Sequence, residues 1–435
     1  MPSRCLAFFT AALLAALPSA IRADPAHGAQ SATRVAVAES LPWPADPAFA
    51  PTAERVSALT RLGRQMFNDP ALSASGRMSC ATCHDPAHAF GPPNDLPVQF
   101  GGKHLDQPGT RAVPSLMYGA FTPPFTEHFF DEDRGDVDQG PAGGRTWDGR
   151  VNRTRDQVRI PLLAANEMAN ESPAALADAV KSAPYEAEFR ALFGDKVLDD
   201  PNAVLDGLGA SLEAYLEYQP EFSPYSSKYD AFLAGTAELT AQEARGLALF
   251  NDQQKGNCAN CHFSSVSTKQ TLPNFTDYGL VAIGVPRNPA IPANADPNYF
   301  DMGLCGPVRT DLRENAENCG LFKAPTLRNV ATRKVFYHNG VFHSLTEAVR
   351  FYAERDTNPE KWYSRNADGS VRKFDDLPVA FHGNVNDEPP FDRKPGDAPA
   401  LSEEEIADIV AFLGTLTDGY KPPRQAGVGV PSRTQ

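Results

Sequence analysis

The sequence predicts a mainly α-helical protein, made of two copies of one helical plan that are joined by long loops. Three observations carry this prediction. Apolar residues recur at helical spacing in 172–194, 239–250 and 401–419, a set of short motifs occurs twice in the same order, and no strand pattern repeats. The 39 Pro and 32 Gly among 435 residues interrupt the helical segments, so the connections between them must be long.

The segment 401–419 has the clearest helix ends. Ser402 stands at the N-cap position and Glu405 follows three residues later, which is the pattern of a capping box. Gly419 marks the expected end of this helix.

Two Cys-x-x-Cys-His motifs are the strongest chemical signal in the chain. In an exported protein this motif attaches a c-type haem through two thioether bonds, and its His is the first iron ligand. The competing interpretation places four cysteines around one zinc ion, but it does not explain why a His follows each pair. We therefore predict two covalently bound haem c groups in two cytochrome-c-like helical domains with long Pro/Gly-rich loops. The residues concerned are Cys80, Cys83 and His84 in the first motif and Cys258, Cys261 and His262 in the second.

The duplication extends beyond the haem motifs. "LGRQMFND" (62–69) and "GLALFND" (246–252) precede them, and "VPSL" (113–116) and "APTL" (324–327) follow them. Gly149 and Val158 have the same separation as Gly340 and Val349. A Pro- and Ser-rich stretch, "EYQPEFSPYSSKYDAF", separates the copies. We expect a first cytochrome-c-like domain over 46–222 and a second over 223–425.

The N-terminus has the pattern of a secretory signal peptide over 1–23. Arg4 is followed by an apolar run over 6–17 that is too short to span a membrane, and Ala23 ends a small-residue cleavage site. The alternative is a retained membrane anchor. Residues 24–45 and 426–435 are expected to be a flexible segment and a flexible tail. No later run is long and apolar enough to span a membrane, so we expect a soluble periplasmic protein without membrane insertion after cleavage.

A formal net charge of −14 excludes nucleic-acid binding through phosphate neutralisation and is compatible with a basic protein partner.

Cys305 and Cys319 remain outside the haem motifs. In an oxidising compartment we expect them to form a disulfide, and the alternative is two free thiols.

The two copies differ at the position expected to face each iron. Twelve residues after Gly149 and Gly340, the first copy has Pro161 and the second has Tyr352. Proline has no side-chain donor atom, whereas a tyrosine phenolate binds haem iron in some proteins. The internal repeat therefore suggests one open haem and one closed haem. Met302 is the alternative ligand of the second iron, since it is the only Met after His262.

The chain resembles the bacterial dihaem cytochrome c peroxidases and their MauG-type relatives over nearly its whole mature length. The resemblance lies in both haem motifs and in "TWDGR", "FKAPTLRNV", "YHNGVFHSLTEAVRFY" and the segment that ends in "LSEEEIADIVAFL". It implies that His84 binds the peroxide-reactive haem and His262 the electron-transfer haem.

The resemblance also implies roles for four further residues. Trp147 matches the tryptophan between the haems, and Gln157 and Glu167 match the glutamine and glutamate of the peroxide site. Glu167 would then transfer the proton that cleavage of the O–O bond requires, while Gln157 orients the peroxide. Tyr352 matches the axial tyrosine of the MauG-type branch.

Two departures from the family pattern matter. The family binds calcium between its domains partly through an Asn, and here that pair reads Arg111-Ala112, so calcium remains doubtful although the backbone carbonyls of Arg333 and Val335 could contribute. The reductively activated peroxidases also carry a blocking His at a place where this chain has Gly102. His104 lies two residues away and is a possible substitute.

Three functions remain open at this point. The first is a peroxidase that reduces hydrogen peroxide with electrons from a small cytochrome c or a cupredoxin. The second is a MauG-type oxidase that uses peroxide to oxidise tryptophan in a partner protein. The third is a dihaem electron carrier without catalysis, against which Pro161 argues.

Overall fold

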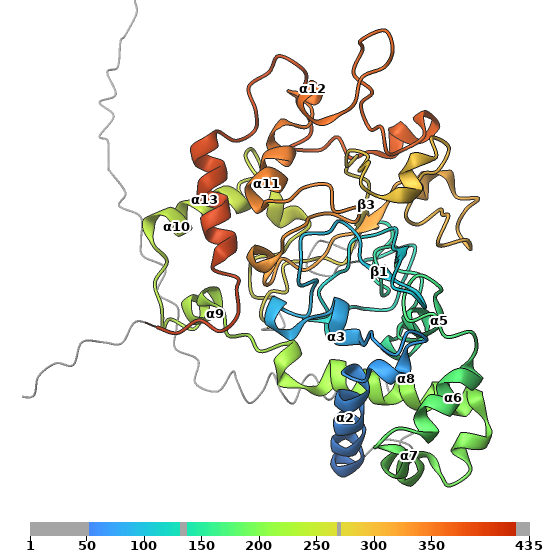
Figure 1. Cartoon of the computed structure of the whole chain (residues 1–435). Coiled ribbons are helices and arrows are strands. Elements are labelled where there is room, and N and C mark those ends of the chain that lie inside the picture. Colours follow the sequence, from blue (N-terminus) through green and yellow to red (C-terminus); the bar gives the residue numbers. More distant parts are fainter. Residues whose placement is uncertain (1–51, 131–136, 268–270, 423–435) are drawn as a thin grey trace, which may run out of the picture.

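The computed structural model describes residues 52–130, 137–267 and 271–422 (Figure 1). The expected signal peptide (1–23), N-terminal segment (24–45) and C-terminal tail (426–435) lie outside the described residues. The α-helices are α2 (Ala53–Phe67), α3 (Cys80–Cys83), α4 (Thr154–Gln157), α5 (Arg159–Leu163), α6 (Pro173–Lys181), α7 (Glu186–Phe193), α8 (Pro201–Tyr218), α9 (Lys228–Leu233), α10 (Ala241–Asn251), α11 (Leu345–Glu354), α12 (Pro359–Trp362) and α13 (Glu403–Gly414).

The predicted fold class is confirmed, because the described residues are mainly helical with long connections. Their strands form two short antiparallel pairs, β1 (Phe100–Gly101) with β2 (Gln107–Pro108) and β3 (Leu280–Val281) with β4 (Phe322–Lys323). None of the helices in the described part of the chain has the length and hydropathy that crossing a bilayer requires.

Two predicted helices differ from the structure, one because it divides in two and the other because it ends earlier. The segment 172–194 divides into α6 and α7, because Pro184 disfavours helical geometry at the preceding residue. In α13 the capping box of Ser402 and Glu405 is confirmed, but the helix ends at Gly414 and not at Gly419. Beyond Gly414 the chain leaves the helix to make tertiary hydrogen bonds, among them one from the Asp418 N–H to the side chain of Asn329.

In each copy of the repeat, a glycine allows two helices to cross with their backbones in contact. A Cβ atom at Gly63 on α2 would lie 2.0 Å from the carbonyl oxygen of Ser211 on α8. A Cβ atom at Gly246 on α10 would lie 2.0 Å from the carbonyl oxygen of Asp408 on α13. Glycine thus lets the two backbones touch in both copies. Figure 1 shows α2 and α8 in the lower part of the molecule and α10 and α13 at its left, in the upper part.

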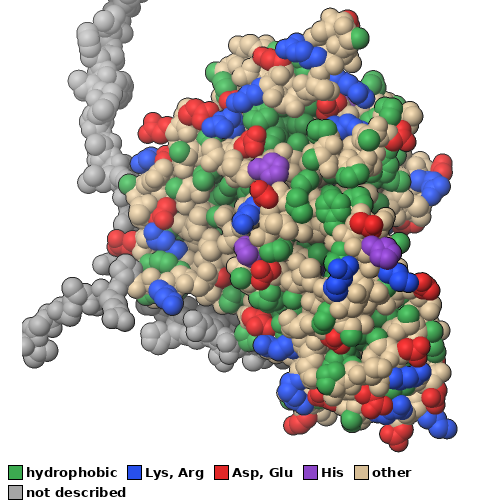
Figure 2. Space-filling view, in the orientation of Figure 1, with side chains coloured by type: hydrophobic (Ala, Val, Ile, Leu, Met, Phe, Trp, Pro, Cys, Tyr) green, Lys and Arg blue, Asp and Glu red, His purple; other side chains and the backbone are tan. Residues whose placement is uncertain are grey.

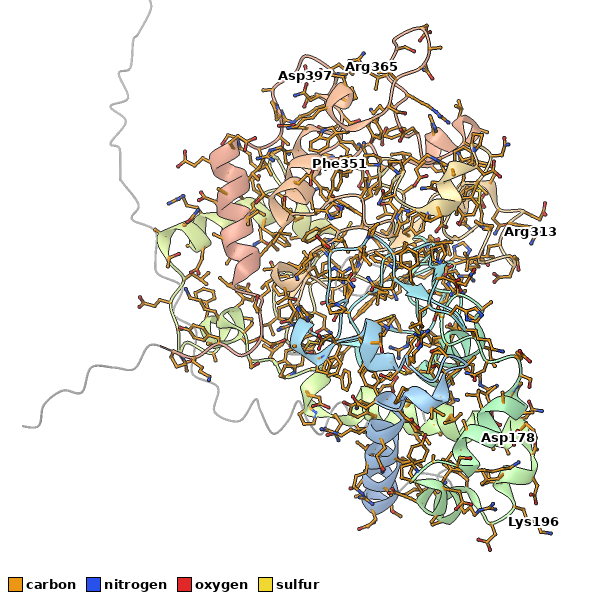
Figure 3. The ribbon with its side chains drawn as sticks, viewed as in Figure 1. Asp178, Lys196, Arg313, Phe351, Arg365 and Asp397 are labelled. Atoms are coloured by element: carbon orange, nitrogen blue, oxygen red, sulfur yellow. A yellow bond between two sulfur atoms is a disulfide. The ribbon has the colours of Figure 1, made fainter. Side chains whose placement is uncertain are left out.

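Buried apolar side chains form two main clusters that share no residue. The first runs from Leu62 to Phe222 and the second from Tyr229 to Leu416, so the change of cluster falls beside the domain boundary that we propose after residue 222. Phe351, which is fully buried, lies inside the second cluster, whereas Asp178 and Lys196 project from the far end of the first (Figure 3).

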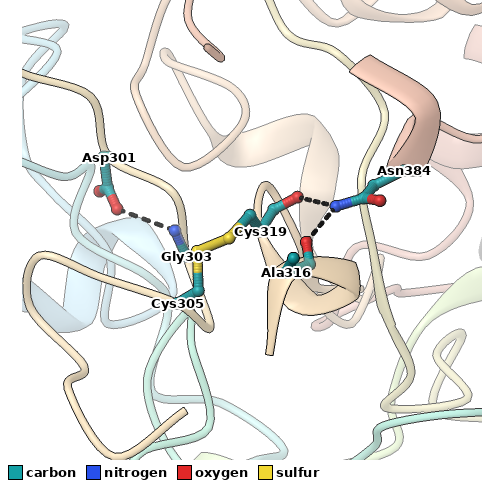
Figure 4. Close-up of a disulfide and its surroundings, with 6 residues drawn as sticks. All are labelled: Asp301, Gly303, Cys305, Ala316, Cys319 and Asn384. Carbon is teal, nitrogen blue, oxygen red and sulfur yellow. Dashed lines mark hydrogen bonds between the residues drawn. A yellow bond between two sulfur atoms is a disulfide. The ribbon is translucent and has the colours of Figure 1, made fainter. Parts of the chain in front are cut away.

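A smaller apolar cluster around Leu304 and Leu321 lies beside a disulfide. Cys305 and Cys319 are joined with an S–S distance of 2.04 Å, which is the pairing expected from the sequence (Figure 4). The Asn384 amide donates hydrogen bonds to the carbonyl oxygens of Ala316 (2.7 Å) and Cys319 (3.0 Å), so this loop is also tied to the 3-10 helix Val379–Asn384.

Buried charges connect the two halves of the chain. Arg111 donates to both carboxylate oxygens of Asp301, at 2.6 and 2.8 Å, and to Asp148 at 2.7 Å. All three side chains are almost inaccessible to solvent, and such charges are tolerated because each one is paired. On the face shown in Figure 2, acidic and basic side chains are interspersed with hydrophobic ones.

Candidate functional site

One large cavity, with a volume of about 840 Å³, reaches both Cys-x-x-Cys-His motifs. Residues from both halves of the chain line it. The sequence-predicted site residues that line it are Cys80, Cys83, His84, Trp147, Gln157, Glu167, Cys258, Cys261, His262 and Tyr352. The fold therefore brings to a single cavity residues that are far apart in the sequence.

The two histidines of the motifs are held in the same way. His84 follows the short helix α3, and its Nδ1 is 3.0 Å from the carbonyl oxygen of Phe90. The Nδ1 of His262 is 2.8 Å from the carbonyl oxygen of Phe275. A carbonyl only accepts, so Nδ1 carries the proton and Nε2 keeps its lone pair for a metal.

Burial keeps these imidazoles neutral. It lowers the pKa of His84 to about 4 and also lowers the pKa of His262. Burial raises the pKa of the Cys80 thiol to about 12 and that of Cys83 to about 11. With such high pKa values these thiols are not ionised at neutral pH, so they are not suited to act as nucleophiles. None of the four motif cysteines is in a disulfide. This donor set fits covalently attached haem c.

Three further residues line the same cavity as His84. Gln157 ends α4, Pro161 lies within α5, and Glu167 follows in a turn. The Glu167 side chain is accessible because it lies in the open cavity, but protein surrounds it on most sides. This burial raises the pKa of Glu167, and the charge of Arg150 partly opposes the rise.

The turn that carries Glu167 rests on the loop that contains β1. The Gly102 N–H donates to the carbonyl oxygen of Glu167 at 2.7 Å. A Cβ atom at Gly101 would lie 2.4 Å from the carbonyl oxygen of Asn166, so the two segments touch through their backbones. His104 is exposed and is not among the residues that line the cavity, so it does not block the site in this structure.

Tyr352 projects from α11 into the same cavity as His262 and stacks on Phe391, with ring centroids 5.4 Å apart. Burial raises the pKa of Tyr352, and a hydrogen bond with the Tyr337 hydroxyl acts in the opposite direction. Met302 packs against the apolar cluster of Leu304 and Leu321 and does not line the cavity. The geometry therefore favours Tyr352 over Met302 as a ligand.

Trp147 lies where the two halves of the chain meet. Its indole N–H donates to the carbonyl oxygen of Ala112 at 2.8 Å, and its own carbonyl accepts from the Lys323 N–H at 2.8 Å. These bonds fix Trp147 between the loops that follow the two haem motifs. The indole is thus held rigidly against the cavity.

The calcium site expected from the resemblance is altered. The guanidinium of Arg333 donates to the carbonyl oxygen of Val335 at 3.2 Å and to that of Val113 at 3.1 Å. A protein cation therefore already uses one carbonyl that we considered for calcium. Among the described residues, no group of three His, Cys, Asp or Glu side chains is placed to hold a metal ion.

Sequence reasoning missed several groups that line the cavity. Lys323 lies in the quoted "FKAPTLRNV" motif, and Tyr337 and His338 lie in "YHNGVF", but none of these three residues received a role. Their presence in motifs that mark the resemblance was the available signal. His338 stacks on Phe322 at 3.5 Å, and its buried Nε2 has no partner in the described part of the chain.

The fold and the cavity define a class, an α-helical protein with two covalently bound haems. The family model of the di-haem cytochrome c peroxidases matches residues 57–238. The methylamine utilization protein MauG of Paracoccus denitrificans is 35% identical over 379 residues, which cover 84% of this chain and 90% of the relative. The cytochrome c551 peroxidase of Pseudomonas aeruginosa is 27% identical over 333 residues, which cover 73% of this chain and 81% of the relative.

A solved structure gives the same result. The diheme peroxidase BthA from Burkholderia thailandensis matches with a TM-score of 0.74 and 41% identity, over 83% of this chain and 86% of that one. The chain belongs to the di-haem cytochrome c peroxidase family, in its MauG-type branch. It is accordingly an oxidoreductase that acts on peroxide, and its cofactors are two c-type haems.

Proposed function

We propose that this protein is a periplasmic dihaem peroxidase that reduces hydrogen peroxide at the haem of His84 and receives electrons through a second haem held by His262 and Tyr352. The observation that carries the proposal is the asymmetry of the cavity. At equivalent positions of the two copies the cavity is lined by Pro161, which has no donor atom, in the half that carries His84, and by Tyr352, which has one, in the half that carries His262.

The reaction would convert hydrogen peroxide, two electrons and two protons into two water molecules. When bound, the haem of His84 would supply the redox-active iron that takes up the oxidising equivalents of peroxide, and the haem of His262 would supply a second redox centre. The Glu167 carboxylate takes a proton from one peroxide oxygen and returns it to the other, which leaves as water. The Gln157 amide donates a hydrogen bond that orients the peroxide. Trp147 provides the aromatic link between the two haems.

The raised pKa of Glu167 supports its part in this scheme. A general acid and base works best when its pKa lies near the pH of operation, and burial shifts the pKa of Glu167 upward from that of a free glutamate. The backbone of Glu167 is also anchored, because its carbonyl oxygen accepts the Gly102 hydrogen bond, so the turn that carries the side chain is fixed.

The electrons would come from a small cytochrome c or a cupredoxin, one electron at a time. The net charge of −14 favours a partner that presents a basic face. The chain would meet such a donor in the periplasm after removal of the signal peptide predicted over 1–23.

A second candidate function has specific support. Tyr352 and the 35% identity to the methylamine utilization protein MauG favour a MauG-type oxidase, which would use peroxide to oxidise tryptophan in a partner protein. In that case the two oxidising equivalents would pass to the partner and the electron donor would not be needed.

Steady-state consumption of peroxide with a reduced small cytochrome distinguishes the two functions. Rapid turnover by the fully oxidised protein, without prior reduction, is the expected result. Negligible turnover together with peroxide-dependent oxidation of a protein tryptophan would establish the second function. His104→Ala is the matched control, and a marked gain in direct reactivity in this variant would mean that His104 closes the first haem.

A further inference from the structure

Lys323 is a cation in the cavity without a carboxylate partner. It lies on β4 beside Trp147, and its ammonium group donates to the carbonyl oxygen of Gly144 at 2.5 Å. No ion pair of Lys323 is found among the described residues. Asp148 acts on it electrostatically, but that carboxylate is already paired with Arg111 and Arg150.

A second cation stands beside it with an unused N–H. Arg145 directly follows Gly144, whose carbonyl accepts from Lys323, and its positive charge acts electrostatically on Lys323. One terminal nitrogen of Arg145 pairs with Glu217 at 2.9 Å and the other donates to the carbonyl oxygen of Gly119. Its Nε is buried and has no partner in the described part of the chain.

This arrangement is unfavourable as it stands. Lys323 and Arg145 repel each other, and burial together with this repulsion lowers the pKa of Lys323 to about 7. A buried N–H without an acceptor also costs free energy. One anion that touched both groups would remove both costs, because it would neutralise the ammonium and accept from Nε.

Glu217 cannot be that anion. The carboxylate oxygen that it presents to Arg145 also accepts from the hydroxyl of Thr154, so it is held on that side. The cofactors of the cavity supply a better candidate. Each haem carries two propionate groups, which are carboxylates at neutral pH.

We propose that the Lys323 ammonium and the Arg145 Nε–H together bind one haem propionate, at the place where the two halves of the chain meet. Lys323 belongs to the second copy of the repeat and Arg145 to the first. The pair is therefore a positioning contact that fastens a haem of one domain to a residue of the other. This inference depends on the presence of two haem c groups and not on the peroxide chemistry of Glu167.

The test is a spectroelectrochemical titration of both haems in the intact holoprotein. Lys323→Met removes a positive charge next to a propionate, so the ferrous state of the nearby haem loses stability. We expect its reduction equilibrium to change at least tenfold, which is about 59 mV for one electron. Lys323→Arg should keep the wild-type potential, because it retains the charge.

The haem whose potential moves identifies the source of the propionate, that is, the haem of His84 or that of His262. Lys181→Met is the matched control, since it removes an exposed lysine charge on α6 that does not line the cavity and is paired with Asp178. Potentials of both haems that shift no more in Lys323→Met than in Lys181→Met would overturn the proposal.

A structure of the wild-type holoprotein gives an independent answer that does not depend on a variant that folds. A propionate oxygen within about 4 Å of the Lys323 ammonium, and in hydrogen-bond reach of Arg145 Nε, is the expected result. A solvent anion or water in this place, with both haems present and their propionates elsewhere, would contradict it. Neither outcome bears on the turnover experiment, so the two proposals fail separately.

Discussion

Pro161 and Tyr352 occupy equivalent positions in the two copies of the internal repeat, and both line the cavity that contains His84 and His262. The equivalence is visible in the backbone. Gly149 and Gly340, twelve residues earlier in each copy, have φ values of +64° and +61°. An isolated bridge between Arg145 and Val151 in the first copy is matched by one between Phe336 and Phe342 in the second. In the function that we propose, this one side chain distinguishes the open site from the closed one.

Tyr352→Phe should change the spectrum of one haem and leave the other unaffected. Phenylalanine has no oxygen to bind iron, so the haem of His262 loses its sixth ligand. The haem of His84 should still bind cyanide with wild-type affinity. Optical and electron paramagnetic resonance spectra of the oxidised protein provide the measurement.

Tyr363→Phe is the matched control for this variant. Tyr363 is a buried tyrosine of the second apolar cluster, its hydroxyl donates to the carbonyl oxygen of Gly284 at 2.6 Å, and it does not line the cavity. Loss of the Tyr363 hydroxyl should lower the stability of the fold and leave the haem spectra unchanged. Unchanged spectra in Tyr352→Phe would return the ligand role to Met302 or another group.

The fold could be predicted from the sequence because its signals are local and occur twice. The haem motifs, the glycines at 149 and 340 and the capping box of Ser402 each depend on a few adjacent residues. The predicted end of the last helix, at Gly419, was wrong, because the point at which the chain leaves α13 depends on the tertiary contacts of Asp418. The carboxylate of Asp418 accepts from the Tyr118 hydroxyl at 2.8 Å, and Tyr118 lies 300 residues away in the sequence.

The site was predicted in part for the same reason. Residues that belong to a recognisable motif, such as His84 and Glu167, lie in the cavity where the resemblance implied. The electrostatic groups could not be predicted, since the partners of Arg111, Asp148 and Asp301 come from three distant segments. The isolation of Lys323 is visible only once the fold shows which acids are already paired.

Glu167→Gln should slow the reaction with peroxide by about 10² to 10⁴ while both haem spectra stay intact. Glutamine keeps the shape of the side chain but cannot accept and return a proton. Stopped-flow spectroscopy after mixing with peroxide gives the rate.

Glu171→Gln is the matched control, because Glu171 lies four residues further on and its side chain is 86% exposed. It should react at the wild-type rate. A Glu167→Gln variant that also reacted at this rate would remove Glu167 from the mechanism.

Treatment with a calcium chelator should leave the thermal midpoint and the haem spectra unchanged. The carbonyl oxygens of Val335 and Val113 accept from the Arg333 guanidinium, so a protein cation already contacts one carbonyl that was considered for calcium and connects it to the first copy. Differential scanning calorimetry with and without EGTA is the measurement. A lower midpoint that added calcium restored would show a metal site that involves other ligands.

Replacement of Cys305 and Cys319 by serine should lower the free energy of unfolding by about 3 kcal/mol, the value expected for closing a loop of this length. Denaturant titration of the holoprotein measures the change. The single variant Cys305→Ser should lose as much as the double variant, because either substitution breaks the bond. Neither cysteine lines the cavity, so a change in the haem spectra would contradict this account.

The rate of reaction with peroxide should fall as the pH decreases through the pKa of Glu167. Burial raises this pKa above that of a free glutamate, about 4.3, so the carboxyl keeps its proton to a higher pH than an exposed one does. The proton-accepting form is the carboxylate, which is lost as the pH decreases. Arg150 opposes the rise, so Arg150→Met should move the acidic limb of the profile to higher pH.

Stopped-flow rates of the wild type, Arg150→Met and Glu167→Gln over a series of pH values measure this effect. The acidic limb should be present in the wild type and shifted to higher pH in Arg150→Met. It should be absent in Glu167→Gln, since glutamine does not titrate. An acidic limb that persisted at the same pH in Glu167→Gln would assign the titration to another group. Asp376, whose pKa burial raises to about 7 and which also lines the cavity, would be the first alternative.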